Sequence, residues 1–282
     1  FIQKNHWNAC LTWLDLKFYS FKMSLSLVEN LPFEVLLKCQ KILISMNDKN
    51  FILQNFDSQV FGYPVYTYQP NSVLDIENVD AKIPKDAVLV SMRIPKSWTH
   101  LMPKTEFREI ECLVIMERSP KKSTSNDLPA NVRICSKADA PACKLIAANC
   151  FQHDRYHKDP MIDDQIAAAG KAQWAFNNVS GRCDASFVLE KDNEIIGFNS
   201  CLKNENTATI DLIGVSPSHQ GRGLGRRLVE AALIHYTNKV QLVKVGTQRD
   251  NHASISIYKS LGFQEIEEYV TYHWTPNQNE KR

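Results

Sequence analysis

The sequence predicts an α+β protein: a mixed, mainly antiparallel sheet flanked by helices and preceded by a smaller α/β domain. Three observations predict this fold class. Apolar-alternating runs at Ala185–Glu190, Glu194–Leu202 and Thr207–Val215 are separated only by short polar turns, which is typical of an antiparallel meander. A glycine-rich loop at 219–225 then leads into alternating helix and strand patterns. The length of 282 residues favours two modest domains over one.

The second half of the chain gives the clearer pattern. Asp139 can cap a helix and Pro141 suits its first turn, so a helix is predicted from there to Phe151. Residues 154–181 are irregular and helical by turns. Beyond the glycine-rich loop the pattern predicts a helix over 226–237, a strand over 240–247, a helix over 252–261 and a last strand over 263–274.

The first half is assigned from the same kinds of signal. Periodicity predicts a helix over 31–46, strands around a Gly62 turn within 51–68, a helix or loop over 75–86, and strands at Ala87–Arg93 and Glu109–Glu117. Residues 119–130 are polar and contain proline, as a linker does. The predicted organisation is an N-terminal extension and helix (1–45), a small α/β domain (46–118), a linker (119–130) and a C-terminal domain (131–282).

Charge and cysteine content limit the partners and the compartment. The 33 Lys and Arg residues nearly balance 31 Asp and Glu residues, giving a net charge of +2, so no nucleic-acid or membrane partner is expected. No run of ~18 uncharged apolar residues predicts a membrane span. The eight cysteines include no C-x-x-C pair, which favours reduced thiols in a cytoplasmic protein. The oligomeric state stays open, a homodimer included.

The first 22 residues precede the first methionine, Met23. They are rich in aromatic residues but lack the apolar core of a signal peptide. We expect them to be an upstream extension, with a docking helix as the alternative.

The stretch 210–233 carries the most informative motif. A predicted strand ends at Val215, and the letters Q-G-R-G-L-G at 220–225 open a helix. Three glycines at alternate positions let backbone N–H groups converge, and at a helix N-terminus such donors suit a phosphate or pyrophosphate. Three arginines stand where the helix dipole disfavours cations unless a polyanion is bound, namely Arg222, Arg226 and Arg227. The alternative is a glycine-rich turn with solvated charges.

Other phosphate-binding and catalytic motifs are disfavoured. A dinucleotide site needs a parallel βαβ unit, whereas the strand before this loop is predicted to belong to an antiparallel meander. The Gly-Lys-Ser/Thr of a Walker loop is absent, as is a G-x-S-x-G nucleophile elbow. His153 and His157 are four residues apart but lack the H-E-x-x-H pattern, so no metal is expected. No local feature marks a low-pKa cysteine, which disfavours covalent catalysis.

The motif at 220–225 matches the Q/R-x-x-G-x-G/A signature of the GNAT acetyltransferase superfamily, and N-H-A-S-I-S-I-Y-K-S-L-G-F at 251–263 resembles its second signature. The resemblance covers about residues 131–275 and implies an enzyme with acetyl-CoA as co-substrate. It implies that the pyrophosphate lies on the 220–225 amides and that main-chain groups of β-strand residues bind the pantetheine arm. The cofactor-binding residues it implies are Ile213, Gly214, Val215, Gln220, Gly221, Arg222, Gly223, Leu224, Gly225 and Asn251.

Segments outside these signatures resemble the dTDP-fucosamine acetyltransferase subfamily. They are 55–66, the R-I-P at 93–95, the E-F-R at 106–108 and the D-R-Y-H-K-D-P at 154–160. The resemblance implies acetylation of the 4-amino group of a nucleotide-linked deoxyamino sugar. Arg155, Tyr156 and His157 would then line the acceptor pocket, with His157 as a candidate base, although water could relay the proton. A solvated loop is the alternative for this segment.

Tyr258 is the candidate catalytic residue. The matching tyrosine of the family protonates the departing thiolate, and a phenol of pKa ~10 can donate to a thiolate whose conjugate acid has a pKa of ~8.5. A core tyrosine is the alternative, because Tyr258 shares a helical face with Ile255 and Leu261. We therefore expect direct acetyl transfer, with a backbone N–H near Val215 as oxyanion donor. Other functions left open are a GNAT enzyme acting on a peptide N-terminus, a polyamine or an antibiotic, and a non-enzymatic CoA-binding protein.

Overall fold

The computed structural model describes residues 50–120 and 127–276, which fall within one compact unit that begins at Lys49. The helix predicted over 31–46 and the extension at 1–22 lie outside the described residues. Within the described part, no helix is long and apolar enough to cross a membrane.

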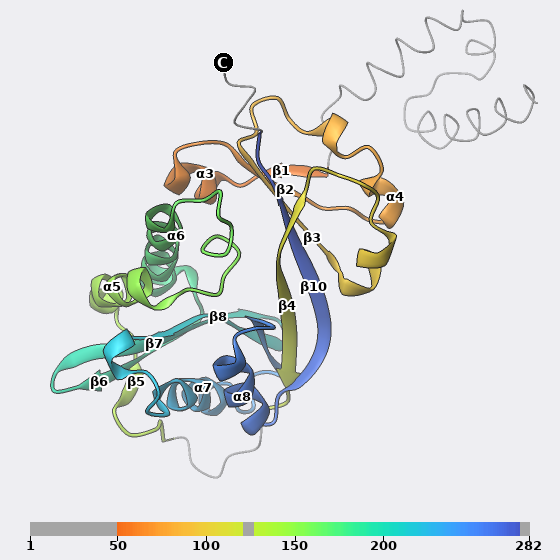
Figure 1. Cartoon of the computed structure of the whole chain (residues 1–282). Helices are drawn as coiled ribbons and strands as arrows, with labels where there is room; N and C mark the ends of the chain where they lie inside the picture. Colours follow the sequence, from red (N-terminus) through yellow and green to blue (C-terminus); the bar gives the residue numbers. More distant parts are fainter. Residues whose placement is uncertain (1–49, 121–126, 277–282) are drawn as a thin grey trace, which may run out of the picture. The chain divides into compact units, whose positions relative to one another are not determined.

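One ten-stranded sheet organises the described residues, in the order β1-β2-β3-β10-β4-β9-β8-β7-β6-β5 (Figure 1). The β2–β3 and β8–β9 pairs are parallel, and the other seven pairs of this sheet are antiparallel. The strands are β1 (Phe51–Leu53), β2 (Val65–Tyr68), β3 (Leu89–Pro95), β4 (Arg108–Arg118), β5 (Val132–Ile134), β6 (Ala185–Lys191), β7 (Glu194–Asn204), β8 (Thr207–Val215), β9 (Leu242–Gln248) and β10 (Gln264–Trp274).

Helices cover both faces of the β5–β8 part of the sheet (Figure 1). In β6 the side chains alternate between these two layers, so Phe187 packs with α7 and α8 whereas Val188 packs with α5 and α6. β8 has a register irregularity opposite Ser200 and Cys201, so Ile210 lies in the first layer and Leu212 in the second. The longer helices are α5 (Ala140–Cys150), α6 (Asp164–Asn177), α7 (Leu224–His235) and α8 (His252–Ser260). The shorter helical segments are α3 (Asn55–Phe61), α4 (Val73–Ile76), η2 (Asp80–Lys82), η3 (Lys96–Leu101), η4 (Lys137–Asp139), η5 (Asn178–Arg182) and η6 (Pro217–His219).

The predicted fold class is confirmed, since a mixed and mainly antiparallel sheet is flanked by helices. The meander of β6, β7 and β8 follows the three predicted runs to within two residues at each end. Strand β10, the last of the described strands, lies between β3 and β4, so strands from both sides of the predicted linker belong to one sheet. A second core under β2, β3 and β10 includes Met92 and Val270.

The prediction of strands throughout 51–68 was wrong in its centre. Residues 55–61 form the helix α3 between the two strands. Phe61 and Val60 pack in a cluster with Ala167 of α6, so these apolar residues form the buried face of a helix. Gly62 ends the helix with a left-handed φ of 76°, a conformation in which glycine carries no Cβ penalty. The Gly62 signal was thus a helix C-cap, not a hairpin turn.

The strand before the glycine-rich loop also differs from the prediction. β8 is antiparallel to β7, as expected, but its other edge is parallel to β9, with α7 as the crossover between them. The antiparallel premise used against a dinucleotide site was therefore incomplete. Pairing of β8 with β9 ends at Ile210 and Val245, although β8 continues to Val215 and β9 continues to Gln248 beside β4. Beyond that point the two parallel strands diverge.

Candidate active site

A pocket of about 310 Å³ lies where β8 and β9 diverge. One wall is Thr209–Ile213 of β8, and the facing wall is Val245–Gln248 of β9 together with Asn251, Ser254 and Tyr258. The segment Cys150–Tyr156 and side chains of α6, β3 and β4 line the other end. The divergence of two paired strands thus creates a cavity that joins the predicted cofactor elements to the polar 154–160 segment.

The free edge of β8 presents backbone groups toward this gap. Ser216 N–H donates to the Ile196 carbonyl of β7 at 2.8 Å. Because the N–H and C=O groups of successive residues in a strand alternate in direction, those of Ile213 and Val215 point away from β7, toward the diverging β9. The Gln220 side-chain amide donates to the Val215 carbonyl at 2.9 Å. This edge can pair with the amides of an extended ligand, as an added strand would.

The glycine-rich loop joins β8 to α7. Gly221 and Gly223 both have a φ of +73°, and a Cβ at either position would meet no atom within 4 Å. The glycines therefore provide a left-handed backbone rather than close packing. Leu224 and Gly225 are the first residues of α7, whose leading N–H groups have no intrahelical acceptor and carry the positive end of the dipole. Such an end favours an anion.

Gly214 is needed for a different reason. A Cβ at this position would lie 2.6 Å from Cys150 Sγ and 3.0 Å from a ring carbon of Phe198. Burial raises the pKa of the Cys150 thiol to about 12, so this cysteine stays protonated at neutral pH. Cys150 is therefore a packing residue beneath the β8 edge.

Tyr258 and Asn251 both reach the pocket from α8. Tyr258 is 3% exposed, lines the pocket and packs edge-to-face on Phe263 with ring centroids 5.5 Å apart. Burial raises the pKa of Tyr258, so the phenol is protonated at neutral pH. Asn251 caps α8, with its side-chain oxygen accepting from Ser254 N–H at 3.1 Å. The two residues thus combine a structural role with a position on the pocket wall.

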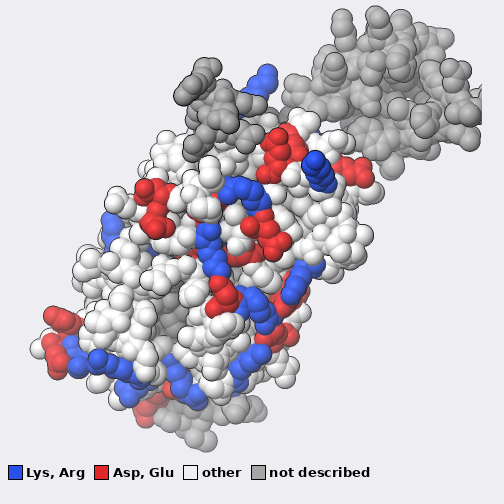
Figure 2. Space-filling model, in the orientation of Figure 1, with Lys and Arg blue, Asp and Glu red and all other residues white. Residues whose placement is uncertain are grey.

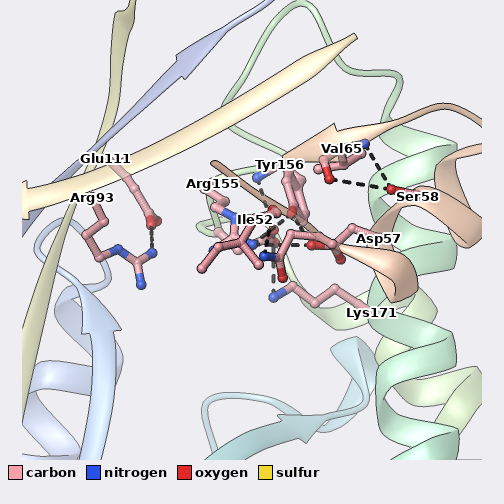
Figure 3. Close-up of polar contacts among 11 residues, drawn as sticks. Ile52, Asp57, Ser58, Val65, Arg93, Glu111, Arg155, Tyr156 and Lys171 are labelled. Atoms are coloured by element: carbon pink, nitrogen blue, oxygen red, sulfur yellow. Dashed lines mark hydrogen bonds and ion pairs between the residues drawn. The ribbon is translucent and has the colours of Figure 1, made fainter. Parts of the chain in front are cut away.

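Arg155 and Tyr156 lie at the opposite end of the pocket. The Arg155 guanidinium donates to the Tyr156 hydroxyl at 2.7 Å, and that hydroxyl donates to Asp57 Oδ2 at 2.7 Å (Figure 3). Tyr156 is 5% exposed. Burial raises the pKa of the Tyr156 phenol, although Arg155 opposes the shift. Residues 154–156 are thus a packed wall of the pocket rather than part of a solvated loop.

His157 does not line the pocket. Its Nδ1 lies 2.5 Å from Asp154 Oδ2, and the side chain is 12% exposed. Lys171 Nζ lies 3.8 Å from the other oxygen of Asp154 and stacks over the Trp174 ring at 4.8 Å. Burial alone would raise the pKa of Asp154, but Lys171 and His157 outweigh it and lower that pKa to about 2. His157 therefore acts on Asp154 and holds the loop.

Two pocket residues that were not predicted come from the first half of the chain. Glu111 of β4 is buried, and its Oε1 accepts from Arg93 of β3 at 3.1 Å and from Thr271 of β10 at 3.2 Å. Figure 3 shows the Arg93–Glu111 pair across the site from Arg155 and Tyr156. Glu111 stands out in the sequence as a charged residue within the apolar run at 109–117. Alternation alone does not indicate which cavity its side chain faces.

The segment 154–160 is anchored to the sheet by a buried ion cluster. Arg108 of β4 donates to both oxygens of Asp159, at 2.8 and 3.2 Å. His273 of β10 has its Nδ1 2.8 Å from Asp159 Oδ2, and both side chains are fully buried. Hydrogen bonds from His273 and Arg108 lower the pKa of Asp159, outweighing the opposing effect of burial. The long strands β4 and β10 therefore fix the wall that carries Arg155 and Tyr156.

A sheet that splays beside a glycine-rich helix N-terminus defines a GNAT-type fold. A solved GCN5-related N-acetyltransferase from Sphaerobacter thermophilus has a similar fold, with a TM-score of 0.54 and 15% identity over 80% of this chain and 76% of that one. Residues 147–263 match the family model described as Acetyltransferase (GNAT) family. The match over residues 147–263 confirms the resemblance to the GNAT acetyltransferase family that the sequence predicted.

Two relatives differ in the activity that their names suggest. The spore coat polysaccharide biosynthesis protein SpsD of Bacillus subtilis is 30% identical over 145 residues, which cover 51% of this chain and 50% of that protein. The N-alpha-acetyltransferase RimI of Mycobacterium tuberculosis is 27% identical over 143 residues, covering 51% of this chain and 84% of that protein. The match thus spans only half the length of the spore coat relative.

Proposed function

We propose that this protein is an acetyl-CoA-dependent N-acetyltransferase whose acceptor is the amino group of a nucleotide-linked deoxyamino sugar of the dTDP-fucosamine type. The observation that carries the proposal is the single cavity between the diverging β8 and β9 strands. It brings the edge at Ile213 and the phenol of Tyr258 together with a polar acceptor end at Arg155.

The proposed binding of acetyl-CoA is supported by the backbone geometry. The β8 edge at Ile213 and Val215 suits the amides of pantetheine, and the N-terminus of α7 suits the pyrophosphate. An N–H at this edge can polarise the thioester carbonyl. Tyr258, protonated and on the pocket wall, can then give its proton to the departing thiolate.

The acceptor end of the pocket combines cationic side chains with carboxylates, so it suits a polar substrate that carries both phosphates and an amine. Arg155, Arg93 and Lys171 bring three cationic side chains to the acceptor end, and arginine forks suit the oxygens of a phosphate. The similarity to a protein named for spore coat polysaccharide biosynthesis supports a sugar acceptor. Similarity to an N-alpha-acetyltransferase favours a peptide N-terminus as the second candidate.

The test measures thiol release from acetyl-CoA with three acceptors: a dTDP-4-amino-4,6-dideoxyhexose, an alanine-terminated hexapeptide and spermidine. We expect the sugar nucleotide to have the highest kcat/KM, by about tenfold or more, since only it carries the phosphates that the arginines suit. Preference for the hexapeptide would replace the sugar with the second candidate. Thiol release with none of the three would overturn the transferase proposal for these amine classes.

A further inference from the structure

Among the carboxylates that line the described pocket, Glu111 differs from the rest in its partners. Asp211 Oδ2 accepts from Trp174, Asn178 and Arg182, each at 2.8 Å. Asp154 is occupied by His157 and Lys171. By contrast, Glu111 Oε2 is buried without a hydrogen-bond partner in the described structure, on a side chain that is 1% exposed. A buried carboxylate oxygen without a donor is destabilising, so a bound group is expected to supply that donor.

The other oxygen of Glu111 is held in place. Oε1 accepts from the Arg93 guanidinium at 3.1 Å and from the Thr271 hydroxyl at 3.2 Å, and Thr271 also accepts from Arg93 Nε at 3.0 Å. These contacts come from three adjacent strands of the sheet, β3, β10 and β4. The carboxylate is thereby fixed in orientation on a residue that lines the pocket, and its second oxygen has no hydrogen-bond partner among the described residues.

We infer that Glu111 is a catalytic residue that binds the acceptor's ammonium group through Oε2 and takes its first proton. This inference rests on the proposed acetyl transfer. Two neighbouring polar side chains are already engaged: the Tyr156 hydroxyl donates to Asp57, and His157 faces Asp154 outside the pocket lining. An ammonium carries three N–H donors and the opposite charge, so it satisfies the oxygen that the fold leaves without a partner.

The proposed step transfers one proton from the ammonium before the acetyl group moves. The ammonium gives one proton to Glu111 Oε2, and the amine lone pair then attacks the thioester carbonyl carbon to form the C–N bond. On collapse the C–S bond breaks, the sulfur takes the Tyr258 proton, and the nitrogen returns its second proton to the phenolate through water. Glu111 then releases its proton to solvent, so one ammonium and one thioester give one amide, one thiol and one proton.

The test is Glu111→Gln, with Glu109→Gln as the matched control on the same strand. Glu109 is exposed and its carboxylate meets the Tyr272 hydroxyl at 3.4 Å, outside the pocket lining. For Glu111→Gln we expect kcat to fall by about 10²–10⁴-fold, with a raised acceptor KM and an acetyl-CoA Kd within about threefold of the parent. The control should leave all three values within about threefold of the parent.

A structural role alone predicts the opposite pattern, namely a lower Tm with a parental kcat in the folded fraction, and that result would overturn the inference. If Glu111→Gln does not fold, Glu111→Asp is tested instead. This variant keeps the negative charge but is one methylene shorter, so the carboxylate oxygens lie farther from the acceptor and kcat should fall by about tenfold or more. A parental kcat in Glu111→Asp would equally overturn it.

The acceptor panel separates this inference from the proposed function. If the parent acetylates the hexapeptide or spermidine but not the sugar nucleotide, the sugar proposal fails, and the loss in Glu111→Gln with the accepted amine still supports the role of Glu111. If the sugar is acetylated equally by parent and Glu111→Gln, the inference fails and the proposed function stands. Absence of transfer to every amine in the parent overturns both.

Discussion

Burial gives single side chains of this protein their chemical state. Desolvation raises the pKa of the Tyr258 phenol and that of the Cys150 thiol, so both groups stay protonated well above neutral pH. The pKa of Asp154 is shifted in the opposite direction, because Lys171 and His157 outweigh burial and lower it to about 2. The neighbours of these residues thus widen the pH range over which Tyr258 and Cys150 stay protonated and Asp154 stays charged.

Tyr258→Phe keeps the aromatic ring and its edge-to-face contact with Phe263 but removes the proton assigned to the leaving thiolate. We expect kcat to fall by about 10²–10⁴-fold while the acetyl-CoA Kd hardly changes. Steady-state kinetics and calorimetry on one purified variant measure both quantities. Tyr269→Phe, at a half-buried position outside the pocket lining, is the matched control. A turnover within about threefold of the parent would show that Tyr258 is not the acid.

Asp154→Asn tests the electrostatic anchor of the pocket wall. The folded pKa of about 2 lies below the ordinary value of 3.8, so the carboxylate contributes stability that is fully present above pH 4 and is lost as the pH falls toward 2. The contribution is about 2 kcal/mol at neutral pH, with roughly half remaining at pH 3.

Urea unfolding of parent and variant at pH 7, 5 and 3 measures this difference. The gap in unfolding free energy should be constant from pH 7 to 5 and narrow by pH 3. Asp192→Asn, at a turn residue whose side chain is 86% exposed, should show no such narrowing. A difference in unfolding free energy between the parent and Asp154→Asn that does not depend on pH would contradict the lowered pKa of Asp154.

At the scale of elements, the ends of strands and helices create the site. β8 and β9 stop pairing at Ile210 and Val245, and the N-terminus of α7 begins one glycine-rich turn beyond the end of β8. The residues of β8 alternate between half-buried and buried, while the unpaired edge of the strand remains available to a ligand. Backbone groups therefore supply most of the proposed cofactor contacts.

Gly223→Glu places a negative side chain at the helix N-terminus where the pyrophosphate is proposed to bind. We expect CoA affinity to fall by about tenfold or more through charge repulsion, while the fold survives because no atom lies within 4 Å of the new Cβ. Gly223→Ala is the control, since both variants bear the cost of about 1 kcal/mol for a left-handed φ. Isothermal calorimetry should show a near-parental Kd for the alanine variant only. Unchanged binding by Gly223→Glu would reject the phosphate-cradle assignment.

At the scale of the whole described unit, one sheet ties the acceptor wall to the cofactor strands. β10 pairs with β3 and β4, and β4 pairs with β9, so Arg93, Glu111 and the β8–β9 gap belong to one continuous hydrogen-bonded layer. Acidic and basic side chains are interspersed on the face shown in Figure 2, in keeping with the near-zero net charge. The shared sheet explains how residues far apart in sequence converge on one cavity.

Arg108→Ala tests the link between this sheet and the 154–160 segment. The variant leaves the fully buried Asp159 with His273 as its remaining ion partner, so we expect a loss of about 2 kcal/mol in unfolding free energy. Arg249→Ala is the matched control: both arginine side chains are 36% exposed, but Glu265, a partner of Arg249, is 27% exposed where Asp159 is 0%. The control should lose at most about 1 kcal/mol. Equal losses in urea unfolding would show that burial of the carboxylate does not matter.

The sequence by itself determined the meander, the glycine-rich loop, the helices around it and the family, because these depend on local periodicity and on short motifs. It also indicated Tyr258 and Arg155, which the structure brings to one pocket. Only the tertiary structure decided that residues 55–61 are a helix, that His157 faces Asp154, and that Glu111 lies in the cavity. Those outcomes depend on contacts between distant segments: α6 packs on α3, and β10 enters between β3 and β4. Local sequence patterns do not indicate which distant strands pair with each other. That pairing decides which polar side chains share a buried site.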